Sequence, residues 1–366
     1  MKFLRLFTLL LLVHTFASCD KDYLAEIDVA ETVYVGSYDK KLYAIDAATG
    51  VKKWEFATND EIHSSPYLAN GTVYVGSDDH KLYALDAVTG VKRWEFITDD
   101  EIRSSPIVAN GTLYVGSLDG RLYALDATTG AKQWVSETSS GPIYSSPSVA
   151  GETVYIGGKD GKVYAIDAAT GAKKWVFAEI PSNGITGLTL ARGLVYAGLD
   201  STLFAFDAIT GAKRWQFQAE SVVTSAPTVK NGKVYIGTFK GRLYARDAAQ
   251  GIERWEFSSD TTNSSAMVGN GMVYVASVDG KLHALDAVNG QKKWESMTKS
   301  PIHSSPTVAG GGVYVSSLNE KSLYAFDATT GAVRWVFQTG GNISSSPCVV
   351  MKSGEAYHSG GIGVQE

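Results

Sequence analysis

Cysteine is scarce in this sequence, with two residues, Cys19 and Cys348, among 366. A pair so far apart gives no disulfide framework. Cys348 stands in a segment with the pattern of a core strand, and no histidine or acidic residue has a spacing from it that indicates catalysis. We therefore expect Cys348 to be a small buried side chain rather than a nucleophile.

An excess of basic charge is also missing. Lys and Arg number 33 against 38 Asp and Glu, which gives a formal net charge of −5. A nucleic-acid-binding protein needs a basic stripe, so this class is excluded. Helical periodicity is absent as well, which leaves β-structure as the source of the core.

Long hydrophobic runs are missing, and the apolar stretch at residues 6–16 is too short to span a bilayer comfortably. It follows Lys2 and Arg5 and ends in small residues before Cys19, as secretory signals do. We predict that residues 1–18 are a lipoprotein signal peptide and that Cys19 becomes the lipidated first residue, although Phe16 stands where Leu is usual. An ordinary signal peptide with an incidental Cys19 is the alternative.

Residues 19–30 are expected to be a polar, lipid-anchored tether. Several acyl chains on Cys19 would hold the protein stably at a membrane, because one chain gives only marginal binding. The expected location is the bacterial cell envelope, on the outer membrane, facing either the periplasm or the cell surface. Asp20, Lys21 and Asp22 are similar to signals that send some lipoproteins to the surface.

One repeated unit dominates the rest of the chain. An Asp-Ala pair is followed by Gly and then by Trp, each four residues further on, and the unit recurs at roughly 40-residue intervals, which is typical of propellers and arrays. The eight tryptophans all occupy this one position, as Trp54, Trp94, Trp134, Trp175, Trp215, Trp255, Trp294 and Trp335.

Each repeat reads as four short antiparallel strands, A to D, with A innermost. In one copy the strands are predicted at residues 102–109, 112–117, 121–126 and 131–135. Asp119 and Gly120 tolerate positive φ and predict a tight hairpin between the second and third of these strands. Four short strands per period predict an all-β fold, a single eight-bladed β-propeller of four-stranded antiparallel blades spanning residues 31–350.

The pattern A-x-D-x-x-T-G-x-x-x-W, followed by S-S-P and G-x-V-Y-V-G, resembles the tryptophan-docking repeat of PQQ-type, quinoprotein-like propellers. The overall layout is similar to that of the outer-membrane assembly lipoproteins of the BamB type. The resemblance implies that each Trp packs on the Ala and Gly peptides of a neighbouring motif and so ties adjacent blades. One buried indole per interface would replace a single central core.

The two ends of the repeat array complement each other. The first repeat has strands B to D but no strand A, whereas residues 343–350 read as a strand A with nothing complete after it. We predict that they form one blade, which closes the ring and leaves no free edge. Residues 351–366 resemble a decayed strand B and are expected to be a loose tail. The least regular repeat, at residues 183–192, is open to two interpretations, a specialised sector or neutral drift.

Acidic turns are interpreted as structural. The pairs at residues 78–79, 119–120, 160–161 and 279–280 lack the ligand spacing of a Ca²⁺ loop. The Asp of each Asp-Ala pair is short enough to cap the turn before the Gly. We therefore expect no catalytic, cofactor-binding or metal-binding residue among them.

The residue just before Ser-Ser in strand A changes chemistry from blade to blade. A varied polar ring at the mouth of the channel is what a ligand-reading surface requires, although side chains that merely solvate the channel are an alternative. Around the ring this position reads His63, Arg103, Tyr144, Thr186, Thr224, Asn263, His303 and Ser344.

Three functions remain open. A PQQ-dependent dehydrogenase would need a stacking aromatic, cations, Ca²⁺ ligands and a catalytic Asp, and in this sequence every Trp is already assigned to docking. A surface propeller that binds a ligand or carbohydrate would suit such regular repeats. We favour a non-enzymatic, monomeric scaffold that binds a protein partner in the envelope, with no cofactor, and with PQQ and Ca²⁺ belonging to the enzyme alternative.

Charge indicates where a partner would dock. Acidic residues gather in the D-to-A connections of the early blades, and basic residues gather at the starts of the D strands. In a propeller the D-to-A connections lie on one face and the C-to-D turns, which precede the D strands, lie on the other. An acidic face would steer a complementary partner. The candidate partner face consists of Asp60, Glu61, Asp99, Asp100 and Glu101.

Overall fold

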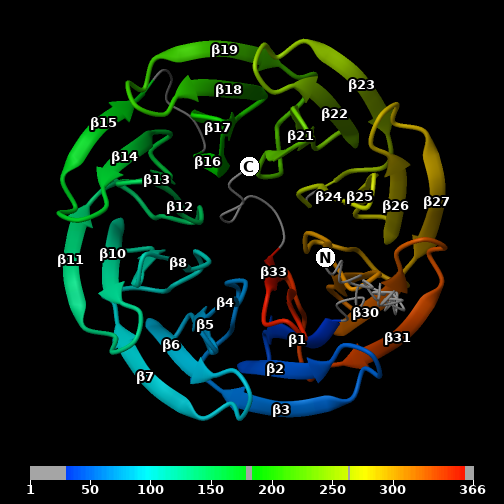
Figure 1. The fold of residues 1–366 in the computed structure, drawn as a ribbon, viewed down its shortest axis with the longest axis horizontal. Coiled ribbons are helices and arrows are strands. Elements are labelled where there is room, and N and C mark those ends of the chain that lie inside the picture. Colours follow the sequence, from blue (N-terminus) through cyan, green and yellow to red (C-terminus); the bar gives the residue numbers. More distant parts are fainter. Residues whose placement is uncertain (1–29, 179–183, 263, 359–366) are drawn as a thin grey trace, which may run out of the picture.

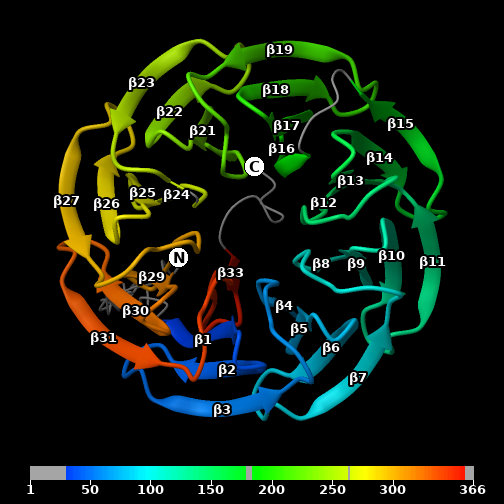
Figure 2. The ribbon, with the colours of Figure 1, turned by 180° about the vertical axis from the view of Figure 1, so that it is seen from behind.

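The computed structural model describes residues 30–178, 184–262 and 264–358. Eight antiparallel sheets stand side by side in a ring around a central channel (Figures 1 and 2). The predicted all-β, eight-bladed propeller is therefore confirmed. Across the described ranges, no helix has the length and apolar character needed to cross a membrane. Apart from Ala30, the predicted signal peptide, tether and lipidated Cys19 lie outside these ranges.

The chain builds the ring in sequence order. The first blade contains β1 (Ala30–Ser37), β2 (Lys41–Asp46), β3 (Lys52–Ala57), β32 (Cys348–Met351) and β33 (Ala356–His358). The second to fourth blades contain β4 (Tyr67–Ala69), β5 (Thr72–Gly76), β6 (Lys81–Asp86) and β7 (Lys92–Ile97); β8 (Ile107–Ala109), β9 (Thr112–Gly116), β10 (Arg121–Asp126) and β11 (Lys132–Glu137); β12 (Ser148–Ala150), β13 (Thr153–Gly157), β14 (Val163–Asp167) and β15 (Lys173–Phe177).

The other half of the ring follows the same order. The fifth to eighth blades contain β16 (Ile185–Ala191), β17 (Leu194–Leu199), β18 (Thr202–Asp207) and β19 (Lys213–Gln218); β20 (Thr228–Lys230), β21 (Lys233–Gly237), β22 (Arg242–Asp247) and β23 (Glu253–Ser258); β24 (Met267–Gly269), β25 (Met272–Ala276), β26 (Lys281–Asp286) and β27 (Lys292–Met297); β28 (Thr307–Ala309), β29 (Gly312–Ser317), β30 (Ser322–Asp327) and β31 (Val333–Gln338).

The second and third strands of each blade are buried on both sides, because every sheet packs between two others. This is why their sequences are nearly continuous apolar runs rather than alternating ones. The outermost strands alternate, with exposed charged residues between inward-facing ones. Asn70 and Gly71, which join β4 to β5, both have positive φ, at 49° and 68°, as a tight hairpin turn requires.

The tryptophans tie each blade to the next. Each indole Nε1 donates a hydrogen bond, 2.9–3.3 Å long, to the carbonyl of the Ala that follows the repeated Asp in the neighbouring blade. The ring covers the Gly of the same turn, where a Cβ on Gly90 would lie 2.7 Å from Trp54. Trp335 makes the same contact with Ala47, which joins the last blade to the first.

The ring closes as predicted. β32 pairs with β1, from Ala30 opposite Met351 to Tyr34 opposite Cys348. The prediction of a loose tail is wrong for residues 351–358, because the chain turns after Met351 and adds β33 as a fifth strand on the inner side of β32. The inner edge of β32 was free to pair, so β33 did not have to compete with β1 for a place in the sheet.

The inner strands are shorter than predicted. Strand A of the third blade was expected at residues 102–109, but β8 begins only at Ile107. In the preceding segment the hydroxyl of Ser104 accepts the hydrogen bond of the Gly116 amide at 3.2 Å, in place of a backbone carbonyl. Equivalent serine latches are made in seven blades, by Ser64, Ser104, Ser145, Ser225, Ser264, Ser304 and Ser345.

The next serine in each motif links neighbouring blades. Its backbone amide donates to the hydroxyl of the equivalent serine in the following blade, at 2.9–3.1 Å. This serine belt consists of Ser265, Ser305, Ser346, Ser65, Ser105 and Ser146. Gly187 and Ala226 interrupt it in the fifth and sixth blades. In the fifth blade the backbone pairs directly, Gly187 opposite Gly198, and β16 is correspondingly long.

Candidate functional site

The candidate site lies where the D-to-A connections meet the B-to-C turns, at the start of the inner strands. We call this end of the channel the mouth. Ile62 is fully buried against Gly36 of the preceding blade, where an added Cβ would come within 2.1 Å of the Ile62 side chain. Ser64 is also buried, and its hydroxyl donates a hydrogen bond to the carbonyl of Gly76 at 2.8 Å. Because successive extended residues face opposite ways, His63 between them is the partly exposed one.

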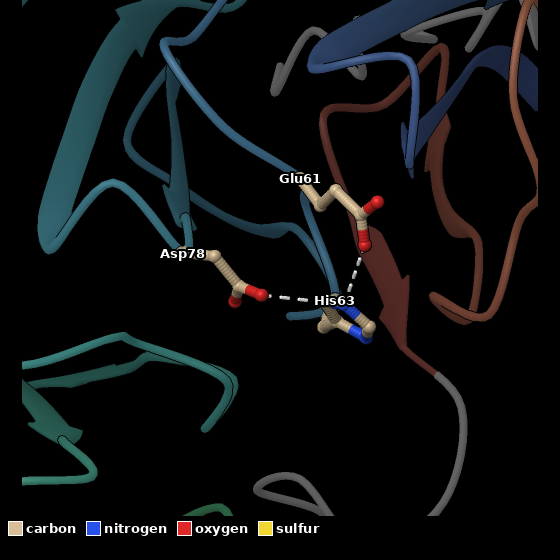
Figure 3. A group of neighbouring side chains, drawn as sticks. All are labelled: Glu61, His63 and Asp78. Carbon is tan, nitrogen blue, oxygen red and sulfur yellow. Dashed lines mark hydrogen bonds and ion pairs between the residues drawn. The ribbon is translucent and has the colours of Figure 1, made fainter.

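His63 stands between two carboxylates (Figure 3). Its Nε2 lies 3.2 Å from Oε2 of Glu61 and 3.4 Å from Oδ2 of Asp78. The ring of Tyr38, from the preceding blade, packs against the imidazole at a centroid distance of 4.3 Å. Three blade segments therefore fix the orientation of His63.

Arg103 completes this cluster from the third blade. Its Nε and Nη2 donate to the two oxygens of Asp78 at 3.2 and 2.9 Å, and Nη2 also lies 2.7 Å from Glu101. The Asp78 side chain is 8% exposed, and burial raises its pKa against the opposing effects of His63 and Arg103. Burial disfavours the charged form of Arg103, but its pairing with Asp78 and Glu101 outweighs this and raises the pKa of Arg103.

The cluster combines one imidazole, three carboxylates and one guanidinium. One nitrogen of His63 and one oxygen each of Glu61 and Asp78 lie within 4.8 Å of one another, close enough to share a cation. Arg103 already donates to both oxygens of Asp78, so an added cation would have to compete with it. Among the described residues, no hydroxyl or thiol is hydrogen-bonded to His63, so nothing there forms a nucleophile–base pair.

The rest of the predicted ring is only partly connected. Tyr144 is 47% exposed and lies close enough to Arg103 to influence its pKa, so it extends the cluster into the fourth blade. Thr224 instead donates its hydroxyl hydrogen bond to the carbonyl of Thr262. Burial lowers the pKa of His303, on the far side of the first blade. Ser344 is partly buried. Asn263 lies outside the described residues, as does the side chain of Thr186, and the ring as a whole stays a prediction.

Most acidic residues of the candidate partner face already have charged partners, which the sequence alone does not show. Asp60 pairs with Lys40 at 3.2 Å, Asp99 pairs with Arg121, and Glu61 and Glu101 belong to the cluster of His63 and Arg103. Asp100 accepts the amide of Glu101 at 2.8 Å. At the starts of the D strands, some bases pair with the turn aspartates, as Arg93 does with Asp86 at 2.7 Å, and others pair with a glutamate of the same strand, as Lys92 does with Glu95 at 2.7 Å. Much of the charge on both faces is therefore paired locally.

Sequence reasoning missed Asp78, the carboxylate that joins His63 to Arg103. The sequence did contain a signal for Asp78. The first residue of the B-to-C turn varies from blade to blade as freely as the residue before Ser-Ser in strand A does. It reads Tyr38, Asp78, Leu118, Lys159, Asp200, Phe239, Val278 and Leu318 around the propeller.

The other acidic turns have structural roles. Asp79, Asp119 and Asp160 each accept a tyrosine hydroxyl from the following strand at 2.5–2.6 Å and a turn amide at 2.9–3.2 Å. The repeated Asp caps its turn, as Asp46 does by accepting the amides of Ala48 and Thr49. Cys348 is fully buried, and burial raises its pKa, as expected for an inert core thiol.

Below the mouth the channel holds a cavity of about 1050 Å³. Its wall comes from the inner strands, which contribute side chains such as Tyr67, Ile107 and Met267, and from the residues of β33. The wall mixes apolar side chains with polar ones such as Thr228 and Lys230, whereas the mouth over the second and third blades carries the charged cluster of His63 and Arg103.

The fold and its interface anchors define a tryptophan-docked β-propeller of the quinoprotein type. A family model described as outer membrane protein assembly factor BamB matches residues 27–105, 99–267 and 247–363, and the chain therefore belongs to that family. No protein of curated function matches the sequence.

Solved structures agree with the fold. BamB from Moraxella catarrhalis is 23% identical, with a TM-score of 0.68 over 79% of this chain and 92% of its own. A computationally designed protein, Ika8, is 18% identical, with a TM-score of 0.72 over 84% and 93%. A europium-containing methanol dehydrogenase is 17% identical, with a TM-score of 0.68 over 83% and 82%. At these identities the likeness shows the architecture, which a designed protein and an enzyme both share.

Proposed function

We propose that the protein is a non-enzymatic, lipid-anchored scaffold of the bacterial envelope that binds a protein partner, in a role similar to outer-membrane protein assembly. The family match along most of the chain supports the envelope setting, and Cys19 would supply the anchor. Closure of the ring within one chain supports a monomeric propeller, since β32 completes the first blade without a strand from a second copy.

The mouth over the second to fourth blades carries this proposal. Arg103 and Tyr144 belong to the residue types that dominate binding energy at protein interfaces. Arg103 is held in place by both oxygens of Asp78, and His63 is held by two carboxylates and a ring. A preordered surface loses less conformational freedom when a partner binds.

Two observations favour the scaffold over a quinone enzyme. A PQQ site needs an aromatic platform and free carboxylates for Ca²⁺. The indoles of the chain are engaged in the blade interfaces, and Asp78 is engaged by Arg103. Calorimetry with PQQ and Ca²⁺ tests the dehydrogenase alternative, and a stoichiometric micromolar complex would favour the enzyme over the scaffold.

The proposal is tested by affinity capture from envelope membranes, followed by binding kinetics with the purified partner. Tyr144→Ala and Arg103→Ala should each weaken binding by about tenfold or more, while melting curves check the fold. Reversal of Asp99, Asp100 and Glu101 to Lys should slow association and reduce its salt dependence.

The matched control lies on the opposite face. Reversal of Lys173, Lys174, Lys213 and Arg214 to Glu changes a similar amount of charge and should leave binding unaffected. If this control abolishes the interaction while the mouth variants bind normally, the partner docks on the other face and the proposed site is wrong.

A further inference from the structure

β33 differs from the other strands of the ring because it is an addition to a complete blade. The first blade already has four strands once β32 pairs with β1. β33 then pairs with the channel-facing edge of β32, with His358 opposite Cys348, Tyr357 opposite Val349 and Ala356 opposite Val350. Figures 1 and 2 both show this red strand extending towards the centre of the ring. It contacts β4 on one side and β28 on the other.

The side chains of β33 fill defined places. Tyr357 packs against the core cluster that contains Tyr314 and Met351, and Ala356 packs against the cluster that contains Leu68. The His358 ring stacks on Tyr67, with a centroid distance of 4.3 Å and an interplanar angle of 8°. The groove thus has a site for a small residue, then one for an aromatic ring, then one for a second flat ring.

β33 is attached to the ring through a short ladder. This ladder has three residue pairs, as many as join the inner strand β4 to β5 and half as many as join β1 to β2. The turn before it, residues 352–355, is exposed. The Nδ1 atom of His358 is shielded from solvent and has no hydrogen-bond partner among the described residues, which is unfavourable for a polar atom.

We propose that β33 is a resident occupant of a peptide-docking groove, and that an extended segment of a partner protein replaces it by pairing with β32. The groove is the channel-facing edge of β32 between β4 and β28, and it lies on the wall of the cavity. Strand addition to a free edge supplies main-chain hydrogen bonds, while the flanking sites select side chains. The partner segment therefore carries a small residue, an aromatic residue and a second flat ring in succession, the pattern that β33 itself supplies.

This groove is independent of the docking surface at the mouth, so either proposal can fail without the other. The partner segment binds the groove more strongly than β33 does if it forms a longer ladder with β32, or if its second ring leaves no buried nitrogen without a hydrogen bond. Until then β33 covers the edge of β32, which would otherwise be open to unwanted strand pairing.

The test uses the mature chain, a variant that ends at Ser353, and a labelled peptide that copies residues 353–360. The shortened variant should bind the peptide saturably and at least about tenfold more tightly than the full chain, because a tethered β33 competes at a millimolar effective concentration. A peptide with Asp in place of the copied Tyr357 should not bind. Tyr67→Ala in the shortened variant should weaken binding, whereas Tyr144→Ala at the mouth should not.

A shortened variant that keeps a cooperative melting transition but binds no peptide refutes the proposal, as does equal binding by the full chain. If the truncation does not fold, Tyr357→Asp in the full chain expels β33 without deletion and is titrated in the same way. If neither variant keeps the ring intact, β33 is a permanent part of the fold and the groove does not exist.

Discussion

The docking tryptophans predict a large and measurable loss of stability. Trp134 is 9% exposed, its Nε1 lies 3.0 Å from the Ala168 carbonyl oxygen, and its ring lies 2.7 Å from the position a Cβ would take on Gly171. A buried Trp removes about 150–250 Å² from water, which at about 25 cal/mol per Å² corresponds to roughly 4–6 kcal/mol. Alanine keeps part of that surface, so Trp134→Ala should cost about 3–5 kcal/mol.

Most of this loss should come from packing rather than from the hydrogen bond. The carbonyl of Ala168 also accepts the hydroxyl of Tyr114 at 3.2 Å, so removing the indole leaves no buried oxygen unpaired. Trp134→Phe keeps a ring without the N–H and is the matched control, with an expected loss smaller than that of Trp134→Ala.

The assay is equilibrium unfolding in urea followed by far-ultraviolet circular dichroism, because removing one of eight tryptophans would alter fluorescence directly. In a closed ring the whole transition should shift to lower urea without splitting. A midpoint equal to that of the wild type would refute the packing argument, and two separate transitions would show that the blades do not unfold as one unit.

Three further predictions follow from the ring and its inner strand. Deletion from Ile343 onward removes β32 and should give an open ring that aggregates through β1, whereas deletion from Gly354 onward should leave a monomer; size-exclusion chromatography separates these outcomes, and identical profiles would contradict closure by β32. Gly171 has a φ of +74°, and an added Cβ would meet the Trp134 indole. Gly171→Ala should therefore lower the free energy of unfolding by at least about 1–3 kcal/mol, and by less in a Trp134→Ala background. Equal losses in both backgrounds would show that the two residues do not interact. Burial lowers the pKa of His358 to about 4, so docked β33 binds fewer protons than the free strand: its docking is strongest above the ordinary histidine pKa of about 6.5 and weakens as the pH falls towards 4. Protection of the β33 amides against hydrogen exchange, corrected for intrinsic rates, should therefore drop between pH 7 and pH 5, and constant protection would contradict this.

Local sequence patterns were sufficient for the repeating architecture. The blade count and the closing strand follow from a repeat that includes its own interface anchor and from a first repeat without strand A. The length of strand A was overestimated because Ser104 replaces a backbone partner by its hydroxyl, which a strand pattern does not reveal. The docked β33 could not be predicted either, because its position depends on an edge of β32 that exists only after the ring has closed.

The site was harder to predict because its contacts join different blades. His63 and Arg103 were singled out by their variability, but the residue that joins them, Asp78, lies 25 positions from Arg103. The pairing of Asp99 with Arg121 spans 22 positions and offsets a carboxylate that the sequence presents as unpaired. Such pairs depend on the twist and spacing of neighbouring blades rather than on any local pattern.

The seam between β1 and β32 also constrains when the protein can become native during its synthesis. Gly36 donates to Ser345, and Trp335 donates to Ala47, across separations of 309 and 288 residues. Contacts this distant form late, because the intervening chain must first be ordered. The first three strands therefore leave the ribosome without their innermost partner and stay incomplete until β32 has been made. A chain that must pass through an export channel before it folds would benefit from that delay, since its earliest segment cannot lock into place while the remainder is still being translated.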